Sequence, residues 1–207
     1  MRKEPFFHKL YWRVLRAIGF RQLSWNKQFD AGRWTRGDIA PETRTLVTEL
    51  CNGGRLVEFG CSDGVLPVSI PRSQFSDYLG FDISDSAIQQ AQERAREAGL
   101  TGVTFSVCDM AKWQGGISSV TLVVVEECLY YLSTAEVEIF LQNCCESLVP
   151  GGKILVLIHS GTRHQQTLTT CRRVCDVCQE TVIGTGRFCL TLAPKGQGKN
   201  EIPAKKD

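Results

Sequence analysis

The stretch LVEFGCSDGVLP, residues 56–67, decides how the rest of this 207-residue chain is interpreted. An apolar run leads into a turn that carries Gly60 and Gly64, with Glu58 inside the run and Asp63 inside the turn. A strand that passes through glycines into a helix is the usual phosphate-binding arrangement of open α/β sheets. The spacing G-x-x-x-G, however, matches neither the dinucleotide fingerprint nor the P-loop, which requires a lysine.

The carboxylates near this turn argue against a pyrophosphate, because like charges repel each other. They suit a ligand with an ammonium group, and S-adenosylmethionine carries one beside its sulfonium, ribose and adenine. Its ribose needs a carboxylate at the end of the second strand, where Asp82 stands. Its adenine needs apolar cover and an acceptor at the end of the third strand, which Ile83 and Asp109 can supply. Acidic residues at three successive strands are more specific than the glycines alone.

Strand-like and helix-like segments alternate through the middle of the chain. One helix is predicted to begin at Ser84 and to stop at Gly99, and Ser133 with Glu136 form a capping box for another. A hairpin around the glycines at 184–186 closes the pattern. The strand-like runs are 55–59, a run ending at 82, 103–108, 119–127 and 153–159. This order predicts an α/β fold with a doubly wound, mostly parallel seven-stranded sheet and an antiparallel last strand.

The ends of the chain are predicted to differ from its middle. Residues 1–48 are expected to form an N-terminal helical cap or lid, 49–194 the main domain, and 195–207 a disordered polar tail. Residues 5–20 show helical apolar spacing with basic residues between, which fits packing onto the domain better than peripheral contact with an anionic membrane. Residues 25–38 show no period and are expected to be irregular.

Composition bounds the class of protein. The chain is 43% hydrophobic and 22% charged with a net charge of +2, ordinary values for a soluble globular protein. Its basic residues gather near the N-terminus, which does not by itself indicate nucleic acid. No apolar run approaches the roughly 18 residues that a membrane span needs, and no signal peptide is recognised. A cytoplasmic location is therefore expected, with the 10 cysteines reduced.

The cysteines near the C-terminus raise the question of a metal. Cys175 and Cys178 form one C-x₂-C pair, and Cys171 and Cys189 are the remaining candidate ligands. A zinc site needs a second pair at a defined distance, which this sequence lacks. Buried cysteines that act as small hydrophobic residues are the favoured interpretation, and no metal is predicted.

Several segments together resemble a known family. In order and spacing, LVEFGCSDGVL, YLGFDIS, VCDM, VVVEECLYYL and LVPGGKILVL resemble the successive motifs of class I S-adenosylmethionine-dependent methyltransferases. The resemblance covers roughly residues 50–160 and is closest to the branch that contains the nodulation protein S N-methyltransferase. It implies a Rossmann-like methyltransferase fold, S-adenosylmethionine as cofactor, and methyl transfer by in-line displacement.

The resemblance also implies roles for individual residues. Asp82 would take the ribose hydroxyls, Asp109 the adenine amino group, and Glu58 would orient the loop or reach the amine. Pro67 and Pro71 depart from the family and predict a short or kinked helix after the loop. The implied cofactor-binding residues are Glu58, Gly60, Cys61, Gly64, Asp82, Ile83, Asp109 and Met110.

The catalytic assignment leaves alternatives open. A base is needed only to remove a proton from the acceptor, and Glu127 after the fourth strand and His159 after the fifth are the candidates. Glu126 is an alternative to Glu127. Trp34 and Tyr131 are predicted to bind substrate, although such aromatic residues often serve only as packing.

The predicted function is methyl transfer to oxygen or nitrogen of a small molecule, with a sugar or saccharide intermediate as first choice. One alternative is a methyltransferase fold that only binds a ligand or a partner. Another is an RNA methyltransferase, which the sequence EECLYY after the fourth strand does not favour, because that class carries an asparagine-proline-proline type of motif there. Neither the acceptor nor the oligomeric state follows from the sequence.

Overall fold

The computed structural model describes residues 21–34, 37–183 and 186–197. The amphipathic helix expected over 5–20 and the tail beyond residue 197 lie outside the described residues.

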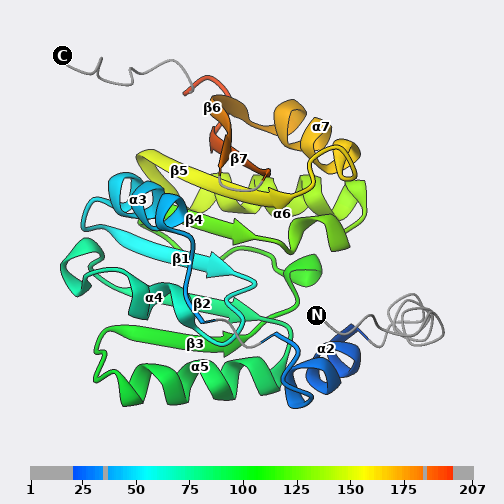
Figure 1. The fold of residues 1–207 in the computed structure, drawn as a ribbon. Coiled ribbons are helices and arrows are strands. Elements are labelled where there is room, and N and C mark those ends of the chain that lie inside the picture. Colours follow the sequence, from blue (N-terminus) through cyan, green and yellow to red (C-terminus); the bar gives the residue numbers. More distant parts are fainter. Residues whose placement is uncertain (1–20, 35–36, 184–185, 198–207) are drawn as a thin grey trace.

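A seven-stranded sheet forms the centre of the fold, in the order β3-β2-β1-β4-β5-β7-β6 (Figure 1). Neighbours among β1 to β5 run parallel, and β7 runs antiparallel to both β5 and β6. The strands are β1 Arg55–Phe59, β2 Tyr78–Asp82, β3 Val103–Val107, β4 Val120–Glu126, β5 Leu148–His159, β6 Asp176–Ile183 and β7 Arg187–Ala193. The predicted fold class and the antiparallel hairpin are confirmed.

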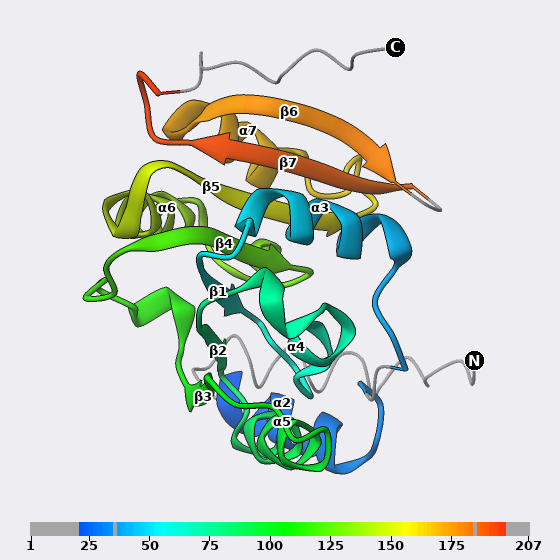
Figure 2. The same ribbon diagram turned by 90° about the vertical axis from the view of Figure 1, so that its left-hand side faces the viewer.

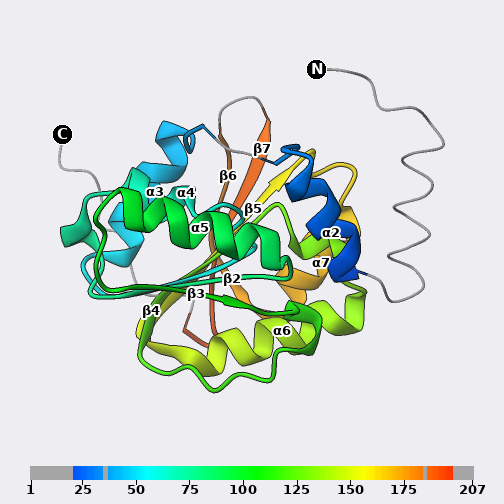
Figure 3. The same ribbon diagram turned by 90° about the horizontal axis from the view of Figure 1, so that it is seen from below.

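Helices cover both faces of the sheet. Helices α3, α4 and α5 lie on one face and α6 and α7 on the other, while α2 lies beside the carboxyl ends of the strands (Figures 2 and 3). The α-helices are α2 Arg21–Asp30, α3 Pro41–Cys51, α4 Val65–Ser69, α5 Asp85–Glu97, α6 Thr134–Ser147 and α7 Gln165–Val174. Short 3₁₀ turns are η1 Arg72–Gln74, η2 Met110–Lys112 and η3 Leu129–Tyr131.

Two apolar clusters hold these layers together. On one side, Val47 of α3 and Leu66 of α4 pack with Leu155 of β5. On the other side, Phe140 of α6 and Leu168 of α7 belong to one cluster with β4 and β5. Strand β4 is buried along almost its whole length, which explains its nearly unbroken apolar sequence.

Local signals set the helix ends as predicted. The Ser84 side chain accepts from the Ala87 N–H, and Ser133 with Glu136 forms a complete capping box at the start of α6. Gly99, with φ of +63°, follows α5 in the left-handed conformation that favours glycine. Helix α4 has only five residues, so the short helix expected from Pro67 and Pro71 is confirmed.

The expectation of an irregular segment over 25–38 is wrong for residues 25–30, which belong to α2. The apolar period is absent there because α2 buries Ser24, Gln28 and Phe29, of which one alone is apolar. The expected domain boundary after residue 48 falls inside α3, which packs against the sheet. At the other end, Lys195 and Gly196 both contact Asp176.

Leu155→Ala tests the core assignment. Leu155 is fully buried, so its truncation should lower the free energy of unfolding by about 2–5 kcal/mol. Ile139→Ala is the control, because Ile139 is 57% exposed on α6 and its loss should cost less than about 0.5 kcal/mol. Urea unfolding measures both, and equal losses would contradict the assignment.

Candidate functional site

The main cavity lies at the carboxyl ends of the parallel strands, where open α/β sheets bind their ligands. Its empty space is about 860 Å³ including the open mouth. Its walls come from α2 and from the ends of β1 to β4. The lining residues are Arg21, Trp25, Phe29, Trp34, Phe59, Gly60, Ser62, Phe81, Asp82, Ile83, Cys108, Asp109, Met110, Glu126, Glu127, Cys128, Tyr130, Tyr131 and Leu132.

The glycine turn lines this cavity through Gly60 and Ser62. Gly60 has φ of +76°, and a Cβ at this position would lie 2.8 Å from the sulfur of Cys128. Ser62 also has positive φ, +53°, and lines the cavity beside Gly60. Cys61 and Gly64 do not line it: Cys61 is buried, and Gly64 packs against Ala91 of α5.

Asp82 connects the turn to the second strand. Its Oδ2 accepts a hydrogen bond of 3.0 Å from the Ser62 N–H, and its Oδ1 accepts one of 2.9 Å from the Ser84 N–H. Ionised acceptors make stronger hydrogen bonds than neutral ones, so this carboxylate fixes the turn relative to the start of α5. Asp82 and the adjacent Ile83 both face the cavity.

The two carboxylates that first suggested an ammonium ligand do not line the cavity. Glu58 is buried, and its Oε2 accepts from the hydroxyl of Tyr78 at 2.5 Å. Burial, and then the charge of Glu58, raise the pKa of Tyr78, so its phenol remains a donor. Asp63 is ion-paired with Arg94 of α5 at 2.5 Å. Both carboxylates therefore stabilise the loop through contacts outside the cavity.

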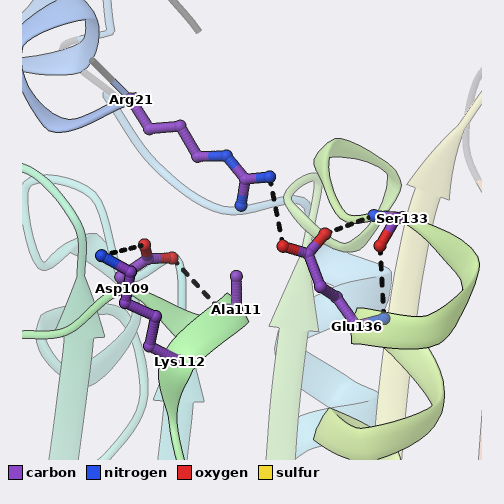
Figure 4. Close-up of polar contacts among 6 residues, drawn as sticks. All are labelled: Arg21, Asp109, Ala111, Lys112, Ser133 and Glu136. Carbon is purple, nitrogen blue, oxygen red and sulfur yellow. Dashed lines mark hydrogen bonds and ion pairs between the residues drawn. The ribbon is translucent and has the colours of Figure 1, made fainter. Parts of the chain in front are cut away.

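Asp109 and Met110 occupy the end of β3. Asp109 caps η2, where its Oδ1 accepts from the Ala111 N–H at 3.1 Å, and Lys112 Nζ lies 3.9 Å from its Oδ2 (Figure 4). Both Asp109 and Met110 line the cavity near Ile83. A carboxylate and two apolar side chains thus share one region of the wall.

The end of β4 supplies two further carboxylates, Glu126 and Glu127. Both were candidates for the base from the sequence, and both line the cavity. Glu126 is 3% exposed and pairs with Arg187 of β7 at 2.7 Å. Glu127 has φ of +56°, and Arg187 Nε lies 3.4 Å from its Oε1. Its Oε2 accepts from the His159 N–H at 3.0 Å and from the Tyr130 hydroxyl at 3.2 Å.

His159 is exposed and does not line the cavity. Its backbone N–H, rather than its imidazole, is the group that meets Glu127. Burial, and then the neighbouring Tyr131 and Glu127, raise the pKa of Tyr130, so this hydroxyl stays protonated as the donor to Glu127.

Helix α2 forms one side of the cavity and is held by polar contacts from its first two turns. Arg21 reaches Glu136 of α6 at 3.2 Å (Figure 4), and the side-chain amides of Gln22 and Asn26 both donate to Asp85 of α5. The helix therefore bridges the starts of α5 and α6 across the carboxyl edge of the sheet.

Aromatic rings from α2, from the segment after it and from η3 meet in the lining of the cavity. The ring centroid of Trp25 lies 5.8 Å from that of Trp34 and 5.1 Å from that of Tyr131. Trp34 and Tyr131, the expected substrate-binding residues, are thus brought together. Arg21, Trp25 and Phe29 were missed, although two tryptophans in a segment without a period were the available signal.

The cysteines give no metal centre within the described ranges, where no group of three or more His, Cys, Asp or Glu side chains is arranged to hold an ion. Cys171 of α7 and Cys175, which follows it, are fully buried in the apolar cluster on that face of the sheet. The sulfur of Cys175 lies 3.7 Å from the sulfur of Cys145. No helix in the described part of the chain combines the length and apolar character that crossing a membrane requires.

Comparison with known proteins adds a family match. Residues 56–152 match the family described as Methyltransferase domain. A 2-heptyl-1-hydroxyquinolin-4(1H)-one methyltransferase of Mycobacteroides abscessus is 26% identical over 60% of this chain and 55% of its own length. A carboxy-S-adenosyl-L-methionine synthase of Trichodesmium erythraeum is 26% identical over 86% of this chain and 61% of its own. The chain thus spans between half and two thirds of these curated relatives.

Solved structures confirm the fold at low identity. The N-methyltransferase NodS of Bradyrhizobium japonicum, in complex with S-adenosyl-L-homocysteine, superposes with a TM-score of 0.61 and 17% identity over 74% of this chain and 86% of its own. A TehB-like methyltransferase of Corynebacterium glutamicum gives a TM-score of 0.63 and 18% identity over 91% of this chain and 97% of its own.

Gly64→Ala tests how closely the glycine turn must approach α5. The added Cβ would lie 2.9 Å from the Cα of Ala91, so backbone must move in addition to the strain of φ at +71°. Gly99→Ala is the matched control, because its φ is +63° and open space surrounds it. Urea unfolding should show a loss of about 1–2 kcal/mol for Gly99→Ala and roughly 1–3 kcal/mol more for Gly64→Ala. Equal losses in the free energy of unfolding would show that a side chain at residue 64 can be accommodated against α5.

Proposed function

We propose that this chain, which carries a class I S-adenosylmethionine-dependent methyltransferase domain, transfers a methyl group from that cofactor to an oxygen or nitrogen of a small molecule. The observation that carries the proposal is the position of Asp82, on the cavity wall between the glycine turn and Ile83.

The residues of the cavity fit this cofactor. The carboxylate of Asp82 is held by the Ser62 and Ser84 N–H groups, and an ionised carboxylate, which has about four acceptor sites, suits the two ribose hydroxyls. Ile83 and Met110 offer apolar contact to the adenine, and Asp109 offers an acceptor for its amino group. At Gly60 the backbone can approach the amino acid end of the cofactor. A side chain on residue 60 would collide with Cys128. When bound, the cofactor supplies a methyl group activated by a sulfonium.

The contribution of the chain to the reaction is position and exclusion of water. A methyl group on a sulfonium is already reactive, so the enzyme mainly has to align the acceptor with it. Trp25, Trp34 and Tyr131 can cover the acceptor on the α2 side. The Arg21–Glu136 pair and the bonds to Asp85 hold this cover in place.

The acceptor is proposed to present a flat apolar face, because three aromatic rings that contact one another line the cavity. A saccharide, the acceptor class predicted from the sequence, has such a face, and so does an aromatic heterocycle. The named substrate of the Mycobacteroides abscessus relative is a hydroxyquinolone, which favours the second class. Transfer of labelled methyl to saccharide and to hydroxyquinolone acceptors distinguishes the two.

Glu127 is the proposed base where the acceptor must lose a proton. Glu127 lines the cavity, whereas His159 does not. The hydrogen bonds from Tyr130 and from the His159 backbone orient one oxygen of Glu127, and its other oxygen lies beside Arg187.

Asp82→Ala tests the cofactor site. Loss of a charged hydrogen-bond acceptor costs about 1.5–3 kcal/mol, so the affinity for S-adenosylmethionine should fall roughly 10- to 100-fold in calorimetry. Asp77→Ala is the control, because Asp77 carries the same charge at the opposite end of β2, where it pairs with Arg55. If the unaltered protein binds no cofactor at millimolar concentration, the enzyme proposal fails and a fold that only binds another partner is favoured.

Glu127→Gln tests the base. With a hydroxyl acceptor, kcat should fall about 10²- to 10⁴-fold while the Kd for S-adenosylmethionine stays the same, because the amide cannot take a proton. His159→Ala should leave kcat unchanged, because the His159 backbone N–H is retained. Steady-state kinetics with calorimetry check both variants. A large loss in His159→Ala and none in Glu127→Gln would reverse the assignment.

A further inference from the structure

A second hollow adjoins the main cavity, between the first turns of α6 and α7. We call it the α6–α7 groove, the space around Thr134, Arg163, His164 and Thr167. Tyr130 lines both the groove and the main cavity, as does Leu132. The groove therefore borders the place where the methyl acceptor is proposed to lie.

Tyr130, stacked on His164, lies between the groove and the main cavity. The rings of Tyr130 and His164 stack with centroids 4.0 Å apart and an angle of 15° between their planes. The Tyr130 hydroxyl donates to Glu127 on the cavity side. Across the groove, the Gln166 amide donates to Thr134 Oγ1 at 2.8 Å and so connects the two helices.

The linings of the groove and of the cavity differ in charge. The charged groups that line the cavity are four carboxylates and one guanidinium, those of Asp82, Asp109, Glu126, Glu127 and Arg21. Among the described residues that line the groove there is no Asp or Glu. Its polar side chains are instead one guanidinium, one imidazole, one amide and several hydroxyls, namely those of Ser133, Thr134, Thr167 and Thr170.

Arg163 differs from the other arginines nearby. Arg172 and Arg173, in the last turn of α7, pair with Glu180 and Glu138. Within residues 21–34, 37–183 and 186–197, no carboxylate lies within ion-pair distance of Arg163. Burial, and then the charge of Arg163, lower the pKa of His164, while the charge of Glu127 acts in the opposite direction.

The start of α7 adds to this positive character. His164 occupies the N-cap position of α7 but makes no side-chain capping bond, whereas Ser133 and Glu136 cap α6 completely. First-turn N–H groups of a helix favour a negative partner, because they carry the positive end of the helix dipole. Gln166 and Thr167, from this first turn, line the groove.

We propose that the α6–α7 groove binds an anionic group of the methyl acceptor, a carboxylate, phosphate or sulfate, and that Arg163 is the main residue that recognises it. The apolar part of the same acceptor lies across Tyr130 against Trp34 and Tyr131. The acceptor is thus an amphipathic molecule with one negative group. The link to a methyl acceptor rests on the proposed function, whereas anion binding in the groove does not.

NMR titrations of the full chain with two probes test the proposal. Inorganic phosphate tests the groove alone, and phenyl phosphate adds a ring that can reach the cavity. The signals of the His164 ring report binding, with and without S-adenosylhomocysteine, so a failure of the cofactor site does not hide the result. Both probes should shift these signals, and phenyl phosphate should bind more tightly.

Matched variants assign the effect to residues. Arg163→Ala should weaken both probes about tenfold, because a charge-assisted pair is lost. Arg172→Ala removes the same charge from the far end of α7 and should change neither. Trp34→Ala should weaken phenyl phosphate alone.

Three results would overturn the proposal. The groove is no anion site if phosphate leaves the His164 signals unmoved, or if Arg172→Ala weakens binding as much as Arg163→Ala. If phenyl phosphate binds no more tightly than phosphate, the groove takes a free anion and not a group of the acceptor.

Discussion

The carboxylate of Asp82 is the constraint on which the site depends. Through one bond to Ser62 and one to Ser84, it holds the glycine turn after β1 against the start of α5. The turn contains residues with positive φ on both sides of Cys61, a strained conformation that neighbouring contacts must maintain. Glu58, bonded to Tyr78, and Asp63, paired with Arg94, support it from the side away from the cavity.

The rest of the site is assembled by segments that are far apart in sequence. Arg187, from the antiparallel hairpin, is placed between Glu126 and Glu127 at the end of β4, so the last strands of the sheet set the charge beside the proposed reaction centre. Helix α2 closes the opposite side through polar contacts to α5 and α6. The proposed acceptor region therefore lies between the charged side chains of Glu126, Glu127 and Arg187 and the aromatic rings of Trp25, Trp34 and Tyr131.

Much of this could be predicted from sequence, because it depends on local patterns. Apolar runs and caps such as Ser84 and Ser133 located most helices and strands. The rule that parallel strands end at one edge placed Asp82 and Asp109 on the cavity. Side-chain direction was harder to predict, since Glu58 and Asp63 face Tyr78 and Arg94 across tertiary contacts.

Helix α2 escaped prediction for the same reason. Its contacts to α5 and α6 include polar bonds to Asp85 and Glu136, which produce no apolar period along the helix. The cavity-lining residues that it carries, Arg21, Trp25 and Phe29, were missed with it.

A crystal structure of the protein with S-adenosylhomocysteine tests the central claim most directly. The account predicts both ribose hydroxyls on the carboxylate of Asp82, the adenine between Ile83 and Met110, and the amino acid end beside Gly60. A ligand bound elsewhere, or a ribose that does not meet Asp82, would contradict it.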